Sequence, residues 1–161
     1  MTELTNKWHN RFMKIAHEVA DWSKDPSTKV GCVIVDSEKR IISVGYNGFP
    51  RGVDDHEDRL NDRSVKYLMV QHAEANAITN AASINAGERL KGATAYVTHH
   101  PCSNCAGLLI QAGVNNIVTL PPSGSFAERF ADSFAASKVM FEETNTTVNL
   151  LDCANEMENE S

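Results

Sequence analysis

Short apolar runs rich in β-branched residues alternate along the chain with segments of helical periodicity. The runs cover residues 30–35, 40–46, 93–98, 116–120 and 146–151, and the helical segments cover residues 4–22, 72–86, 102–112 and 125–140. Strands that alternate with helices are typical of α/β proteins, in which right-handed crossovers make strands parallel. The first two runs are joined by a turn and predict an antiparallel hairpin. The sequence therefore predicts a three-layer α/β/α sandwich on a five-stranded mixed sheet, with the first hairpin antiparallel and the remaining strands parallel.

Length and charge limit the kind of protein this is. We expect a single domain over residues 1–152 and an acidic, disordered tail over residues 153–161, which has few apolar anchors. The net charge of -6 weighs against a polynucleotide as partner. No apolar run approaches the roughly 18 residues of a membrane span, and the N-terminus lacks the features of a signal peptide. We expect a cytoplasmic protein whose four cysteines are thiols or metal ligands.

Local signals predict where several segments begin and end. Gly87 is expected to end the helix that begins near residue 72, and Gly113 the helix that begins near residue 102. Ser125 and Glu128 fit a capping box that opens the last helix. Residues 47–63 are polar and predict a long loop, which in a compact domain is usually functional or disordered.

One histidine, one glutamate and two cysteines have the spacing of a catalytic zinc site. Cys102 and Cys105 form a Cys-x-x-Cys pair at a predicted strand-to-helix junction, where the helix N-terminus favours the thiolate form. His72 and Glu74 are separated by roughly 200° on an ideal helix, so they face one site only if the helix begins at about His72. The sequence therefore predicts two helix N-termini that meet at one zinc ion.

Other uses of a Cys-x-x-Cys pair fit less well. A redox pair does not require a His-x-Glu partner, and a closed structural zinc site needs a fourth Cys or His ligand. Cys32 is expected to be a small buried residue, and neither it nor Cys153 has metal-ligand spacing. Three ligands (His72, Cys102 and Cys105) and an open fourth position describe a catalytic ion, with Glu74 left as the unliganded acid and base.

The pattern His-x-Glu followed by Pro-Cys-x-x-Cys is the signature of zinc nucleobase deaminases. Over residues 5–151 the chain resembles the cytidine deaminase superfamily. Residues 25–31 and 45–52 are most similar to deoxycytidylate (dCMP) deaminases of phages and eukaryotes, and a cyanophage enzyme is the specific expectation. The resemblance implies that a zinc-activated hydroxide deaminates dCMP to dUMP and ammonia, with Glu74 as proton shuttle, and so supplies dUMP for thymidylate synthesis.

The resemblance also implies substrate contacts. It assigns Asn47 to the sugar, the Ala73 backbone N–H to the pyrimidine carbonyl and His100 to the pyrimidine pocket. An Asn-Gly pair after a strand is also a common turn, and both roles are compatible. The phosphate needs a cationic cradle, for which the sequence leaves five candidates open. These candidates are Lys29, Arg51, Lys66, Arg129 and Lys138.

Many dCMP deaminases are homo-hexamers that dCTP activates and dTTP inhibits at a second nucleotide site. The resemblance places five residues at such a site, with Mg²⁺ as companion of the triphosphate. They are Gly45, Tyr46, Gly48, Asp54 and Asp55. An ordinary flexible loop is the alternative interpretation of this segment. Gln71 stands where some relatives carry a cysteine that binds a second, structural zinc, so a second ion is in doubt.

Three rival functions share parts of these motifs. A tRNA adenosine deaminase has the same metal motif, but the acidic charge and residues 45–50 argue against it. A free-nucleoside or guanine deaminase differs only in its substrate. A non-catalytic zinc domain would have no use for Glu74, so the effect of replacing this residue discriminates between the last possibility and an enzyme.

Overall fold

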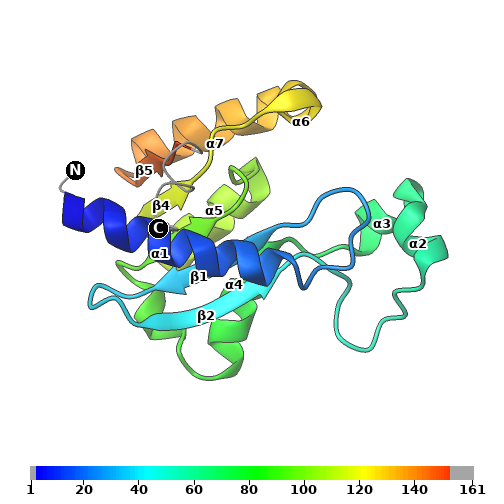
Figure 1. Cartoon of the computed structure of the whole chain (residues 1–161), viewed down its shortest axis with the longest axis horizontal. Coiled ribbons are helices and arrows are strands. Elements are labelled where there is room, and N and C mark those ends of the chain that lie inside the picture. Colours follow the sequence, from blue (N-terminus) through cyan, green and yellow to red (C-terminus); the bar gives the residue numbers. More distant parts are fainter. Residues whose placement is uncertain (1–2, 153–161) are drawn as a thin grey trace, which may run out of the picture.

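The computed structural model describes residues 3–152, so the predicted tail over residues 153–161 lies outside the described residues. Five strands and the helices between them form one layered body (Figure 1). In chain order the elements are α1 (Glu3–Ala20), β1 (Gly31–Val35), β2 (Ile41–Tyr46), α2 (Glu57–Asn61), α3 (Arg63–Met69), α4 (Ala73–Ser83), the 3-10 helix η1 (Gly87–Leu90), β3 (Thr94–Val97), α5 (Ser103–Ala112), β4 (Asn116–Thr119), α6 (Gly124–Arg129), α7 (Ala131–Glu143) and β5 (Thr147–Leu150).

The sheet has the strand order β2-β1-β3-β4-β5, and it confirms the predicted mixed fold. The β1–β2 hairpin is antiparallel, and β3, β4 and β5 are parallel to one another. One pairing adds to the prediction, because β1 is also antiparallel to β3. The crossover through α4 carries the chain from β2 past β1 to β3, which makes β2 and β3 parallel and leaves β1 opposed to both.

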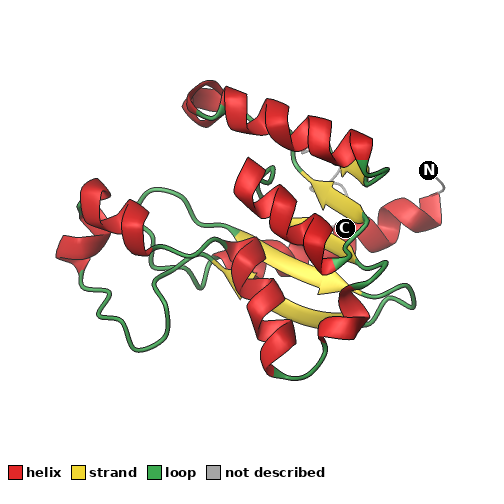
Figure 2. Ribbon diagram, turned by 180° about the vertical axis from the view of Figure 1, so that it is seen from behind, coloured by secondary structure: helices red, strands yellow, loops and turns green. Residues whose placement is uncertain are grey.

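Two apolar clusters fill the spaces on the two faces of the sheet. Cys32 and Ile34 of β1 face a cluster that includes residues of α4, α5 and α7. Val33 and Val35, which alternate with them, face the cluster that includes α1. All five residues of β1 are buried, as expected for a central strand covered on both faces. Figure 2 shows the sheet between these helical layers.

Helix α4 lies unusually close to β2. A Cβ atom on Gly45 would be 2.4 Å from both the Ala73 carbonyl oxygen and the Ala77 nitrogen, so only glycine permits this approach. Asn76 Nδ2 donates to the Tyr46 carbonyl at 2.7 Å, and Asn80 Nδ2 donates to the Val44 carbonyl at 2.8 Å. These bonds satisfy carbonyl groups of an edge strand and fix the position of the α4 N-terminus.

The predicted helix ends are confirmed at one place and wrong at two. Gly113 ends α5 with a left-handed φ of 93°. Gly87 does not end α4, because the left-handed residue is Asn85 (φ 59°), and Ala86 N donates to Ala81 O at 2.9 Å in a Schellman arrangement. Ser125 does not cap a helix either. It lies inside α6, and the chain breaks at Phe130 before α7 begins.

The segment after β2 contains two short helices that the sequence reading missed. Helices α2 and α3 stand beyond one end of the sheet, at the tip of long connections (Figures 1 and 2). Asp62 caps α3, since its side chain accepts a hydrogen bond from Ser64 N.

Across residues 3–152, no helix is long and apolar enough to cross a membrane.

Candidate active site

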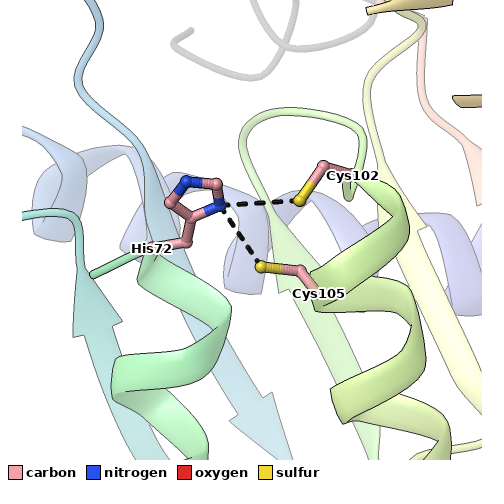
Figure 3. A group of neighbouring side chains, drawn as sticks. All are labelled: His72, Cys102 and Cys105. Atoms are coloured by element: carbon pink, nitrogen blue, oxygen red, sulfur yellow. Dashed lines mark hydrogen bonds between the residues drawn. The ribbon is translucent and has the colours of Figure 1, made fainter. Parts of the chain in front are cut away.

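The three predicted metal ligands come together between the N-termini of α4 and α5 (Figure 3). His72 is the N-cap of α4 and Cys102 is the N-cap of α5, while Cys105 lies in the first turn of α5. His72 Nδ1 is 3.5 Å from Cys102 Sγ and 3.4 Å from Cys105 Sγ. The expected start of the α4 helix at His72 is confirmed to within one residue.

The donor set and its spacing fit zinc. Bonds of about 2.0 Å to nitrogen and 2.3 Å to sulfur in a tetrahedron put the nitrogen about 3.6 Å from each sulfur. The measured N–S separations are close to this value, and all three ligand atoms lie within 4.8 Å of one another. Within the described chain this is the one group of three or more such side chains gathered closely enough to hold a metal ion. The geometry gives no support to a second zinc near Gln71.

The Glu74 side chain is buried beside these ligands, with 4% of its surface exposed. Burial raises the pKa of the Glu74 carboxyl above its ordinary value, and a hydrogen bond with the Cys105 thiol opposes the shift. A carboxyl group with a raised pKa exchanges protons more readily near neutral pH. A buried Glu74 carboxyl beside the metal ligands is therefore suited to both accept and donate protons.

The environment of Cys102 favours the thiolate that a metal needs. Hydrogen bonding with the Cys105 thiol is the largest cause of a strongly lowered pKa at Cys102, and the hydrogen bond with His72 acts in the same direction. A position at a helix N-terminus also favours negative charge. Cys32, by contrast, is fully buried in β1, and burial raises its pKa, which agrees with the predicted role as a small core residue.

A pocket opens over the metal ligands and includes the three residues predicted to contact a substrate. Asn47, Ala73 and His100 line it together with Glu74 and Cys102. Further lining comes from the segment after α1, from α3 and the residues between it and α4, from the loop after β3, and from α6, α7 and the residue between them. These residues are Asp25, Ser27, Thr28, Val30, Arg63, Lys66, Tyr67, Val70, His72, His99, Phe126, Arg129, Phe130 and Phe134.

His100 and Ala73 present different groups to this pocket. His100 Nδ1 lies 3.1 Å from the Pro101 carbonyl oxygen, and a carbonyl only accepts, so the ring donates there and leaves Nε2 as an acceptor. Burial lowers the pKa of His100, which favours the neutral ring. Ala73 is the first residue of α4, and a backbone N–H at this position has no partner within the helix.

Asn47 is held by the segment that follows α1. Its Oδ1 accepts a hydrogen bond from Val30 N at 2.8 Å, and its Nδ2 donates to the Thr28 carbonyl at 2.8 Å. Asp25 fixes the same segment, because its Oδ1 accepts from Ser27 N at 2.8 Å and from Lys66 Nζ at 3.3 Å. Asn47 therefore helps to shape one wall of the pocket by holding the segment that contains Thr28 and Val30.

The structure narrows the candidates for a phosphate cradle. Of the five predicted cations, Lys66 and Arg129 line the pocket, and Lys29, Arg51 and Lys138 do not. Lys66 is buried and paired with Asp25 at 3.3 Å, so its charge is largely compensated. Arg63 also lines the pocket and was missed by sequence reasoning. The signal that could have found it is the Asp62 cap, which starts a helix that carries Arg63 and Lys66 one turn apart.

The five residues assigned to a second nucleotide site have different surroundings in the structure and do not line one common pocket. Tyr46 and Gly48 line a surface pocket together with Arg51 and Asn76. Gly45 is buried under α4, where its small size serves packing. Asp54 contacts His56 at 3.0 Å, and Asp55 pairs with Lys24 at 2.9 Å.

Comparisons with known proteins agree with this geometry. A family model of the cytidine and deoxycytidylate deaminase zinc-binding region matches residues 6–120. An uncharacterized deaminase from Aliivibrio fischeri is 40% identical over 148 residues, which span 92% of this chain and 96% of that protein. Human deoxycytidylate deaminase is 36% identical over 146 residues, which span 88% of this chain and 78% of that protein.

Solved structures share the fold. The dCMP deaminase of cyanophage S-TIM5, solved in complex with dCMP and dUMP, superposes with a TM-score of 0.71 at 24% identity. The match covers 94% of this chain and 99% of that one. At this level of identity the likeness concerns the architecture, and it confirms the predicted class of fold.

Proposed function

Because the chain belongs to the cytidine and deoxycytidylate deaminase family, we propose that it hydrolyses dCMP to dUMP and ammonia. One observation carries the choice of a nucleotide over a free base or nucleoside. A single pocket joins Glu74, His72 and Cys102 to two exposed arginines, Arg63 and Arg129. Guanidinium groups suit a phosphate because they offer several donors in a planar fork. The name of the human relative, deoxycytidylate deaminase, supports the same substrate.

The proposed chemistry divides between the two helix ends. Zinc held by His72, Cys102 and Cys105 would lower the pKa of water and so supply a nucleophile near neutral pH. The Glu74 carboxylate takes one proton from the attacking water and passes it to N3 of the cytosine ring. It then takes the second proton, from the hydroxyl group now on C4, and delivers it to the amino group, which leaves as ammonia. The C4–N bond breaks and a C4–O bond forms in its place.

Neighbouring groups hold the ring and the sugar phosphate. The Ala73 N–H donates to the pyrimidine carbonyl, and His100 lies against the ring. Asn47 and the segment that it fixes form the wall beside the sugar. Arg63 of α3 and Arg129 of α6 bind the phosphate. The aromatic side chains of Phe126 in α6 and of Phe130, between α6 and α7, also line the pocket and help to exclude water.

Regulation and assembly form a second part of the proposal. The protein assembles as a homo-hexamer that dCTP activates and dTTP inhibits. The pocket with Tyr46, Gly48 and Arg51 supports a nucleotide site, since Arg51 supplies a cation beside an accessible backbone. Asp54 and Asp55 lie nearby in sequence, and carboxylates are ligands that Mg²⁺ prefers.

Turnover of the free nucleotide tests the substrate. We expect deamination of dCMP with a kcat/KM far above that for deoxycytidine or guanine, and no inosine in tRNA. Arg129→Gln should lower kcat/KM for dCMP by about 10- to 100-fold, because hydrogen bonds to a charged phosphate are lost. Lys138→Gln, at an exposed cation outside the pocket, should leave it unchanged.

Formation of inosine in tRNA without turnover of dCMP would contradict dCMP as the substrate. Running the dCMP assay with dCTP and dTTP, beside a sizing measurement, tests regulation. Sigmoidal kinetics that dCTP removes support the regulated hexamer, whereas hyperbolic kinetics insensitive to both nucleotides contradict it.

A further inference from the structure

Two serines of α7 hold the chain on both sides of Cys102. The Ser103 N–H donates to Ser133 Oγ at 2.8 Å, and Ser137 Oγ donates to the Pro101 carbonyl at 2.9 Å. Ser103 and Pro101 are the immediate neighbours of Cys102. Helix α7 thus fixes the backbone before and after one proposed zinc ligand, from a part of the sequence about thirty residues away.

The Ser137 hydroxyl is placed for this contact. Its side chain is fully buried, and a buried hydroxyl usually turns back to its own helix. Ser137 Oγ does lie 3.1 Å from the Ser133 carbonyl, but it makes the shorter contact with Pro101. Ser133 Oγ also lies 3.1 Å from Ser103 Oγ, so the two hydroxyl groups form a small network at the start of α5.

A third contact extends the same attachment. Between the two serines, Phe134 packs edge to face against the His100 ring, with 5.2 Å between centroids. The segment from His100 to Ser103 is therefore held at three positions by consecutive turns of α7. Besides these contacts, the Cys102 carbonyl accepts the first helical hydrogen bond, from Ala106 N at 2.8 Å, but the Cys102 side chain makes no capping bond to the helix.

Cys102 needs such support more than the other two ligands do. Cys105 lies within α5, so helical hydrogen bonds fix its backbone. His72 follows Gln71, whose backbone exchanges two hydrogen bonds with Gly48 at 2.8 and 3.1 Å. Cys102 has extended backbone angles at a loop-to-helix junction, outside regular structure. The direction of its Sγ toward His72 therefore depends on what holds Pro101 and Ser103.

From these contacts we infer that Ser133 and Ser137 are positioning residues for zinc binding, acting through Ser103 N and Pro101 O to orient the Cys102 thiolate. Groups that hydrogen-bond around metal ligands commonly set metal affinity in this way. The inference rests on zinc binding at this site and not on dCMP as the substrate. Failure of the proposed substrate would leave it intact.

Zinc release tests this role directly. The zinc-loaded double variant Ser133→Ala/Ser137→Ala should transfer its ion to a chelating dye about 10- to 100-fold faster than the original protein. With Co²⁺ in place of zinc, its absorption bands should shift, because the Cys102 thiolate is no longer held in one direction. Ser133→Thr keeps the hydroxyl group, so this single variant should release zinc as slowly as the original protein.

A matched control separates positioning from general stability. Thr144→Val removes another hydroxyl of the α7 end, one that bonds the Met140 carbonyl at 2.7 Å. It should lower thermal stability slightly and leave zinc release and the Co²⁺ spectrum unchanged. If the double variant lowers the melting temperature but keeps the original release rate and spectrum, the serines serve packing alone and the inference is wrong. Should the double variant fail to fold, Ser133→Ala at the half-buried position decides by the same two measurements.

Discussion

The N-termini of α4 and α5 face each other across the same site, yet they are built differently. At α5 the first backbone N–H is occupied, because Ser103 N donates to Ser133 of α7. At α4 the side chain of the N-cap residue His72 makes no hydrogen bond to the helix, and the first residues, Ala73 and Glu74, line the open pocket. The contrast indicates a division of labour. The α5 end supplies two of the three ligands and is held rigidly, whereas the α4 end keeps donors and a carboxyl group available for a substrate.

The largest effect is expected from a substitution that removes a metal ligand at the α5 end. Cys105→Ala removes a sulfur ligand and should reduce zinc from one ion per chain to a small fraction of that amount, with no detectable activity. The melting temperature should fall as well, since a metal that binds only the folded chain stabilises it. Elemental analysis after dialysis measures the loss.

Cys32→Ala is the matched control for that variant. It removes a buried thiol of β1, beneath the site but outside the ligand set, and should keep the zinc. Full zinc content in Cys105→Ala, or loss of zinc in Cys32→Ala, would mean that the ligand set is wrong.

A smaller effect is expected from a substitution that displaces the α4 end from β2. Gly45→Ala places a methyl group where the Ala73 carbonyl and the Ala77 nitrogen now lie, so α4 must shift away from β2. We expect the free energy of unfolding to fall by about 1–3 kcal/mol, as for other overpacked sites. Denaturation in urea measures the change.

Gly48→Ala provides the comparison on the same segment. A Cβ atom at Gly48 meets no atom within 4 Å, so its free energy of unfolding should change far less. Equal effects of the two substitutions would show that the close approach of α4 to β2 does not limit stability.

The site could be predicted where its chemistry depends on short spacings. His72 and Glu74 can share a site only at a helix start, and the structure has that start. Cys102 and Cys105 follow the same logic at α5. The turn at the end of α4 could not be decided in this way, because Asn85 and Gly87 both tolerate left-handed angles and the chain uses Asn85.

Contacts between distant segments were not predictable. Nothing in the pattern around Ser133 or Ser137 points to Cys102, since the contact arises only when α7 packs beside α5. The resemblance assigned Gly45 to a second nucleotide site, but its role in admitting α4 close to β2 became visible only in the structure. Arg63 escaped notice because residues 47–63 read as loop and the short helix α3 was not expected.

The division of labour is tested most directly by Glu74→Gln, which keeps the size of the side chain and removes its ability to take a proton. Zinc content and ammonia release from dCMP would be measured on the same sample. We expect zinc to remain at the original level while ammonia release falls by at least about 100-fold, because the α5 end still holds the ion and the α4 end has lost its acid and base. Ammonia release within a few-fold of the original protein would contradict this account.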